Sequence, residues 1–234
     1  MQVLTGSTLL ALWERGATLH PIDRCALLAA VAWRDGSADS VADLPLGTVN
    51  EHLLRLREAC FGPRIEAHAD CPRCGQRLSF ALDTRVLLEG ADGARRPAPG
   101  ALDPGLRPPS LRDLAAVADA QDATEAARRL LERCLPGGTG AALNRDSLAD
   151  IDAALDAVDP RADLSLALTC PDCGHSGSAR LDPGALLWDE LAASAQALLA
   201  DVHRLARAYG WTEDQVLALG PVRRAHYLSL VGTS

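Results

Sequence analysis

Cys71-Pro-Arg-Cys74-Gly75 and Cys170-Pro-Asp-Cys173-Gly174 are the two stretches that decide the fold of this chain. In each stretch two residues separate the cysteines, which lets both sulfurs reach one tetrahedral zinc ion with bonds of about 2.3 Å. The proline presets φ, and the glycine after the second cysteine tolerates a left-handed turn that points amide groups at the sulfurs. Four thiolates complete the coordination of zinc, as in structural sites. The sequence therefore predicts one structural Zn²⁺ ion bound by Cys71, Cys74, Cys170 and Cys173.

The residues beside each cysteine pair alternate between apolar and polar, as in a β-strand. Leu78, Phe80 and Leu82 follow the first pair, and a similar alternation over residues 164–168 precedes the second. Each pair is thus predicted to lie on a hairpin, and the two hairpins together form a four-stranded zinc ribbon. Because 95 residues separate Cys74 from Cys170, the ion would connect distant parts of the chain.

Other interpretations of the cysteines stay open at this point. A CxxC pair can be a redox couple, although the strand leading into a helix that is typical of thioredoxin-like motifs is missing here. The four thiols could also be buried without metal, and His175 is an additional candidate ligand. The other three cysteines, Cys25, Cys60 and Cys134, lie in helical stretches among apolar neighbours and are interpreted as small buried hydrophobic residues.

The composition favours a mainly α-helical protein with a small β element. The chain has 234 residues, of which 48% are hydrophobic but only 3% aromatic, so its core is built mostly from Leu, Ala and Val. The predicted order is an N-terminal helical segment (1–63), the first hairpin (64–88), a Pro/Gly-rich linker (89–109), a helical insertion (110–160), the second hairpin (161–182), and a long C-terminal helix with a helical tail (183–234).

Helix boundaries follow from capping residues, prolines and glycines. In the N-terminal segment we expect a helix from Ser7 to Arg15 ended by Gly16, a second beginning at Pro21, and a third that opens with the capping-box pattern Thr48 to Glu51. Further helices are predicted at Ser110–Asp113, Thr124–Leu135, Ser147–Val158, 183–209, after Thr212 and from Pro221.

The long C-terminal helix carries an apolar stripe with heptad spacing. Its members are separated by alternating steps of three and four residues: Trp188, Leu191, Ala195, Leu198, Val202, Leu205 and Tyr209. Two interpretations are compatible with this spacing. The stripe packs on the chain's own helices, or it is a docking surface for a partner protein, together with the tail from Trp211 to Leu230.

Charge and motif content argue against several functional classes. The formal net charge is −8, without a basic stripe, so we expect no nucleic-acid binding. No apolar run is long enough to span a bilayer, and the N-terminus does not resemble a signal peptide, so a cytoplasmic protein is expected. The histidines show no metal-ligand spacing, and no nucleophile or phosphate-binding motif occurs. We therefore predict no catalytic residues, no organic cofactor and no enzymatic activity.

Several segments together resemble the baseplate hub assembly chaperone family of T-even-type phages and related contractile injection systems. The similar residues are Leu12-Trp-Glu-Arg-Gly16, His20-Pro-Ile-Asp-Arg24, Leu44-Pro-Leu-Gly47, Phe61-Gly-Pro-Arg64, Leu186-Leu-Trp-Asp-Glu190, Leu205-Ala-Arg-Ala-Tyr-Gly-Trp-Thr-Glu213 and Pro221-Val-Arg-Arg-Ala-His-Tyr-Leu228. The resemblance implies a non-enzymatic assembly factor or component of a phage-like contractile tail baseplate, with baseplate or hub and spike proteins as partners. The alternative is a nucleic-acid-binding zinc-ribbon adaptor of a transcription or RNA-processing machine, in which Arg64, Arg73, Arg77 and Arg85 would contact the nucleic acid.

Overall fold

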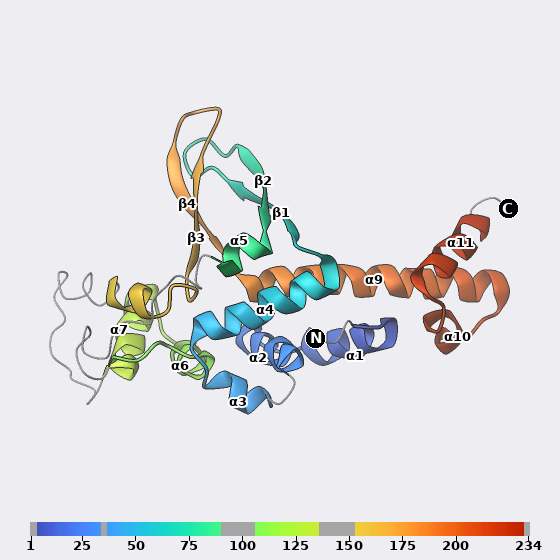
Figure 1. Ribbon diagram of the computed structural model, residues 1–234, viewed down its shortest axis with the longest axis horizontal. Coiled ribbons are helices and arrows are strands. Elements are labelled where there is room, and N and C mark those ends of the chain that lie inside the picture. Colours follow the sequence, from blue (N-terminus) through green and yellow to red (C-terminus); the bar gives the residue numbers. More distant parts are fainter. Residues whose placement is uncertain (1–3, 34–36, 90–105, 136–152, 232–234) are drawn as a thin grey trace.

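The computed structural model describes residues 4–33, 37–89, 106–135 and 153–231. Within these residues the protein is mainly helical, and two separate two-stranded antiparallel hairpins project from the helical body (Figure 1). The predicted fold class is confirmed at this level. The elements are α1 (Gly6–Ala17), α2 (Pro21–Ala32), α3 (Ala38–Ala42), α4 (Leu46–Phe61), β1 (Arg64–Asp70), β2 (Arg77–Asp83), α5 (Thr84–Glu89), α6 (Leu111–Val117), α7 (Ala123–Cys134), β3 (Leu164–Thr169), β4 (Ser176–Leu181), α9 (Pro183–Tyr209), α10 (Glu213–Leu217) and α11 (Pro221–Val231).

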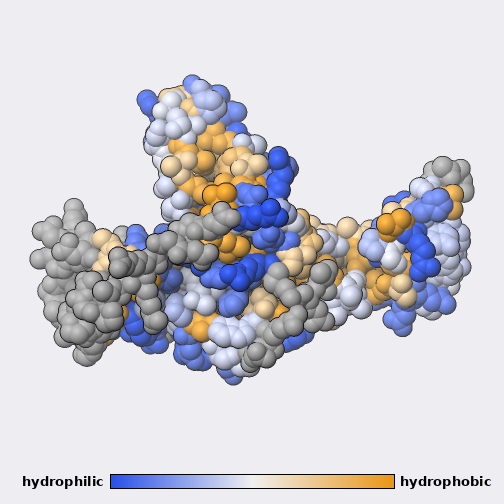
Figure 2. Space-filling model, in the orientation of Figure 1, coloured by the Kyte–Doolittle hydropathy of each residue, from blue (hydrophilic) through white to orange (hydrophobic). Residues whose placement is uncertain are grey.

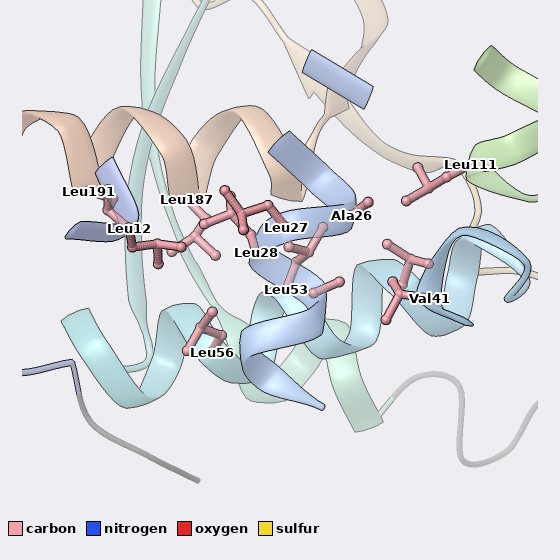
Figure 3. Close-up of a cluster of buried hydrophobic side chains, with 12 residues drawn as sticks. Leu12, Ala26, Leu27, Leu28, Val41, Leu53, Leu56, Leu111, Leu187 and Leu191 are labelled. Carbon is pink, nitrogen blue, oxygen red and sulfur yellow. The ribbon is translucent and has the colours of Figure 1, made fainter. Parts of the chain in front are cut away.

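The long helix α9 is the common packing partner of the body. Near its start, Leu187 and Leu191 join apolar residues of α1, α2 and α4 in the main core, as Figure 3 shows. Further along, Leu198 packs against Leu10 of α1, and Leu205 packs against Val216 of α10. The heptad stripe from Leu191 to Leu205 is therefore buried within the chain itself, whereas Trp188 is partly buried and Tyr209 exposed. The hypothesis that it docks a partner is wrong for its central residues, since Leu198 is 6% and Leu205 0% exposed.

A close approach between α1 and α9 depends on a glycine. A Cβ atom on Gly16 would lie 2.4 Å from the indole ring of Trp188. Gly16 was expected to end the first helix, but the helix continues to Ala17, so this residue serves packing rather than termination. Arg24 of α2 completes the contact. Its guanidinium donates to the carbonyls of Gly16 and Ala17 and lies 4.5 Å from the centroid of the Trp188 ring.

The start of α4 differs from the prediction as well. The helix begins at Leu46 rather than after a capping box at Thr48, and its side-chain cap comes from a residue far away in the sequence. The Gly47 amide donates to the Asp159 carboxylate over 2.9 Å. Burial raises the pKa of Asp159, while the Gly47 hydrogen bond partly opposes that shift. Glu51, predicted to close the capping box, instead pairs with arginines.

A partly buried ion pair joins α4 to α9 where the first hairpin begins. Arg57 donates two hydrogen bonds to the Glu190 carboxylate, at 2.9 and 2.6 Å, and a third to the carbonyl of Gly62. Arg57 is only 3% exposed. A bidentate pair of this kind fixes geometry as well as charge, so it sets the position of the chain that leaves α4 and enters β1.

Several other predicted boundaries agree with the structure. Helices begin after Ser110 and after Thr212 as expected, each at a capping box, and Pro183 begins α9 while Gly210 ends it. The short helix α3 was not predicted. Most of the predicted linker at 89–109 lies outside the described residues, as do positions 147–152 of the expected helix Ser147–Val158, whereas residues 153–158 are helical. No helix in the described part of the chain is long and apolar enough to cross a membrane.

Replacing Gly16 with Val tests the α1–α9 contact. The new side chain would overlap the Trp188 ring, so the free energy of unfolding should fall by about 3 kcal/mol. Ala11→Val, on the exposed side of the same helix, should cost less than about 0.7 kcal/mol through helix propensity alone. Equal losses in denaturant unfolding would show that the close approach does not exist.

Candidate metal centre

Both cysteine pairs lie on tight turns at the tips of the hairpins. The last paired residues are Asp70 opposite Arg77 in the first hairpin and Thr169 opposite Ser176 in the second. In each turn the first cysteine accepts a hydrogen bond from the amide of the glycine four residues later, at 2.8 Å in the first hairpin and 3.0 Å in the second. Its own amide donates to the carbonyl of the residue after that glycine, at 2.9 and 2.8 Å. The two turns therefore have the same hydrogen-bond pattern.

The glycine in each turn is required by its backbone conformation. Gly75 has φ +75° and Gly174 has φ +68°, in the left-handed region that residues with a Cβ atom rarely adopt. This is the conformation that the sequence pattern predicted. It bends the chain back around the first cysteine of each pair, so that both sulfurs of a pair point to the same side.

The two tips bring all four predicted cysteines together. The ligand atoms of Cys71, Cys74, Cys170 and Cys173 lie within 4.8 Å of one another. The closest pairs join the two hairpins: Cys71 Sγ is 3.7 Å from Cys173 Sγ, and Cys74 Sγ is 3.6 Å from Cys170 Sγ. A tetrahedron with metal–sulfur bonds of about 2.3 Å has edges of about 3.8 Å. The spacing of the sulfurs thus fits one tetrahedral ion, and the set can bind a metal such as zinc.

Hydrogen bonds from backbone amides favour the ionised form of two of the cysteines. Hydrogen bonds from the amides of Arg73 and Cys74 lower the pKa of Cys71 to about 6. The Gln76 amide likewise favours ionised Cys74, but the neighbouring thiols and burial outweigh it and raise the pKa of Cys74 to about 12. Neighbouring thiols therefore oppose the ionisation of Cys74 when no metal is bound. A bound divalent cation would offset that repulsion, and metal binding would release protons.

The two cysteines of each pair differ in exposure. Cys71 and Cys170 are 3% and 1% exposed, whereas Cys74 is exposed and Cys173 half-buried. The cluster therefore has a shielded inner side and an outer side through which an ion can enter. Four thiolate ligands leave no coordination position for water, an arrangement typical of structural rather than catalytic sites.

Other residues considered as ligands or nucleophiles lie elsewhere. Among the described residues no histidine or carboxylate joins the cluster, and the His175 ring lies beside Gly177. Cys134 is buried, as predicted, whereas Cys25 and Cys60 are only partly buried. Burial raises the pKa of all three thiols, that of Cys25 to about 12. A high pKa disfavours the thiolate that nucleophilic chemistry requires.

The structure also contains a cavity that the sequence did not indicate. It has a volume of about 540 Å³ and lies where α2, α4 and α6 meet the second hairpin and the start of α9. Several of its polar side chains already have partners. Arg24 caps α1, Asn50 donates to the carbonyls of Arg161 and Ala162, and Asp182 caps α9. These groups hold the walls together.

Comparisons of the chain with protein-family models, with curated proteins and with solved structures give no match.

Metal content provides the direct test of the cluster. The purified chain should contain about one equivalent of metal by elemental analysis. Cys170→Ser should lower this content and reduce the melting temperature by at least about 5 °C, because the second hairpin loses its attachment. Cys60→Ser, at a partly buried cysteine outside the cluster, should preserve the metal. Full metal retention in a Cys71→Ser, Cys170→Ser double variant would contradict the site.

Proposed function

We propose that this protein is a non-enzymatic assembly factor or component of a phage-like contractile tail baseplate, stabilised by one structural zinc ion. The observation that carries the proposal is the shape of the molecule around its cysteine cluster. The hairpins project from one side of the helical body, and α10 and α11 form an arm at the far end of α9 (Figure 1). Such a molecule offers separate surfaces to several neighbours, which suits a protein that acts by binding baseplate, hub or spike proteins in the cytoplasm.

The zinc ion would be structural because the hairpins have little else to hold their tips. Each sheet has only two strands, and isolated two-stranded hairpins are marginally stable in water. Along β1 and β2 the apolar residues other than Ala81 share one face, and among them only Ile65, next to the helical body, is fully buried. Structural zinc contributes on the order of 10 kcal/mol to folding. An ion at the four cysteines would therefore stabilise the whole projection.

The positions of the segments that resemble the baseplate family support the proposal. Gly16, Arg24 and Trp188 come from three of those segments and make one contact. Glu190 belongs to the same segment as Trp188 and is held by Arg57, which also donates to the carbonyl of Gly62 in another similar segment. Segments far apart in sequence thus form one structural unit, as expected if they belong to a common fold.

The nucleic-acid alternative is disfavoured by the arginines on which it depends. Three of the four arginines around the first hairpin pair with carboxylates: Arg64 with Glu66, Arg77 with Asp70, and Arg85 with Glu58. These exposed pairs contribute little to stability, but they neutralise the charge that a phosphate backbone would need. Of the four, Arg73 alone makes no ion pair with a described residue.

Nucleic-acid binding should therefore be weak. With generic single-stranded or duplex oligonucleotides at physiological salt, we expect a Kd above about 100 μM, at the weak limit of non-specific binding. Fluorescence anisotropy of labelled oligonucleotides is a suitable measurement. Micromolar binding that weakens steeply as salt is added would favour the adaptor alternative instead.

A clean deletion of the gene tests the assembly role. In cells that carry the contractile apparatus, the deletion should leave few complete baseplates by electron microscopy, while sheath and tube proteins are still made. Restoring the gene in trans should restore the particles. Normal particle numbers in the deletion strain would contradict the proposal.

A further inference from the structure

The C-terminal arm, residues 202–231, is a small folded unit with its own core. Val202 and Leu205 of α9 and Val216 of α10 are buried together. Around them Tyr209 stacks on Trp211 with ring centroids 4.7 Å apart, and Tyr227 of α11 meets Trp211 edge-on at 4.9 Å. This aromatic packing fixes α11 against the end of α9, so the outer surface of α11 is presented in one orientation.

One face of α11 is used for this packing. Tyr227, Leu228 and Val231 pack against the core of the arm, and Arg224 forms an ion pair with Asp201 of α9 at 3.3 Å. These residues recur at helical spacing on one side of the helix. The residues on the inner face of α11 are therefore used in internal contacts. They include Arg224 but not its neighbour Arg223.

The opposite face of α11 carries exposed side chains. Val222 is 85% exposed, the highest value among the large hydrophobic residues described as exposed, and Leu230 is 46% exposed. Arg223 and His226, which share this face, are exposed too. Val222 is thus an exposed aliphatic residue close in the helix to one cationic and one titratable side chain. Figure 2 shows hydrophobic and hydrophilic surface side by side at this end of the molecule, far from the hairpins.

The arm is also basic, in contrast to the rest of the protein. Residues 202–231 contain four arginines and only two acidic residues, in a chain with a formal net charge of −8. Arg224 pairs with Asp201. The other three arginines of the arm make no ion pair with any residue that the structure describes; they are Arg204, Arg207 and Arg223. All three are exposed. Local positive charge without internal carboxylates is suited to a negatively charged partner.

We propose that the outer face of α11, in an arm whose exposed arginines also include Arg204 and Arg207 of α9, binds an acidic segment of another protein that carries an aliphatic side chain for Val222. Nucleic acid would satisfy the arginines but not Val222. A bilayer would require a larger apolar face with aromatic residues, and the aromatic residues of the arm are packed against one another. A symmetric contact between two copies would place the same cations against each other. This inference rests on the proposed function, because it assigns a partner-binding surface to the assembly factor.

A photo-crosslinking amino acid at Val222 of the full chain tests the surface directly. Because Val222 projects into solvent, the replacement should leave the fold unchanged. In cells that carry the contractile apparatus, we expect a crosslink to another protein, and mass spectrometry should locate it in a segment rich in Asp and Glu. Crosslinking to nucleic acid, to lipid or to a second copy of the chain would overturn the proposal, and so would the absence of any crosslink.

Charge variants show whether the captured segment recognises the basic surface. Replacing Arg204, Arg207 and Arg223 with Glu should reduce the crosslink yield by about tenfold or more, because like charges would then face each other. The same three positions changed to Lys should retain it. Arg15→Glu, at an exposed arginine of α1 outside both the arm and the cysteine turns, is the control and should have no effect. A yield that is unchanged in the triple Glu variant, with normal circular dichroism, would contradict the charge-based recognition.

The deletion experiment separates the two proposals. If the crosslink has the expected chemistry but the deletion strain makes normal particles, the binding surface is correct and the baseplate function is wrong. If the deletion strain lacks particles but the triple Glu variant assembles them normally, the function stands and the binding surface is wrong.

Discussion

Burial of one stripe of α9 is the interaction on which the rest of the structure depends. Helices α1, α2, α4, α10 and α11 all pack against this helix, and its buried residues contribute to three successive apolar clusters. Each fully buried aliphatic side chain contributes about 1.5–3 kcal/mol. Because the sequence contains few aromatic residues, no single large side chain can replace this continuous contact. The length of α9 therefore determines how far the arm lies from the hairpins.

The two hairpins are held at both ends: the helical body fixes their bases, and the cysteine cluster lies at their tips. The first hairpin begins directly after α4, and the second ends at Leu181, just before α9. Packing of α4 on α9 and the Arg57–Glu190 pair set the distance between the roots of the hairpins. The sulfurs, 3.6 and 3.7 Å apart across the hairpins, set the distance between their tips. A metal ion at the tips would thus close a structure whose base is already fixed, which explains how ligands 95 residues apart can form one site.

Features that depend on neighbouring residues could be predicted from the sequence, and those that depend on distant contacts could not. The cysteine turns, the strand alternation and the start and end of α9 follow from local patterns, and the structure agrees with them. By contrast, the glycine at position 16 lies within a helix, where it leaves room for the Trp188 ring. The N-terminus of α4 is capped by Asp159, which is far away in the sequence. The heptad spacing showed that one face of α9 is buried, but it contained no information on whether the chain itself or a partner covers that face.

The same distinction applies to the proposed resemblance to a baseplate family, which would say more about the scaffold than about its partners. In the similar segments, Trp188 and Glu190 have their side chains committed to internal contacts. A residue that packs internally constrains the fold of its own chain and only indirectly what the chain binds. The last segment, Pro221 to Leu228, is different because it contains both kinds of residue. Arg224 and Tyr227 hold α11 in place, whereas Val222 and Arg223 are exposed. If any part of the resemblance concerns binding, the outer face of this helix is where the structure leaves side chains free to do it.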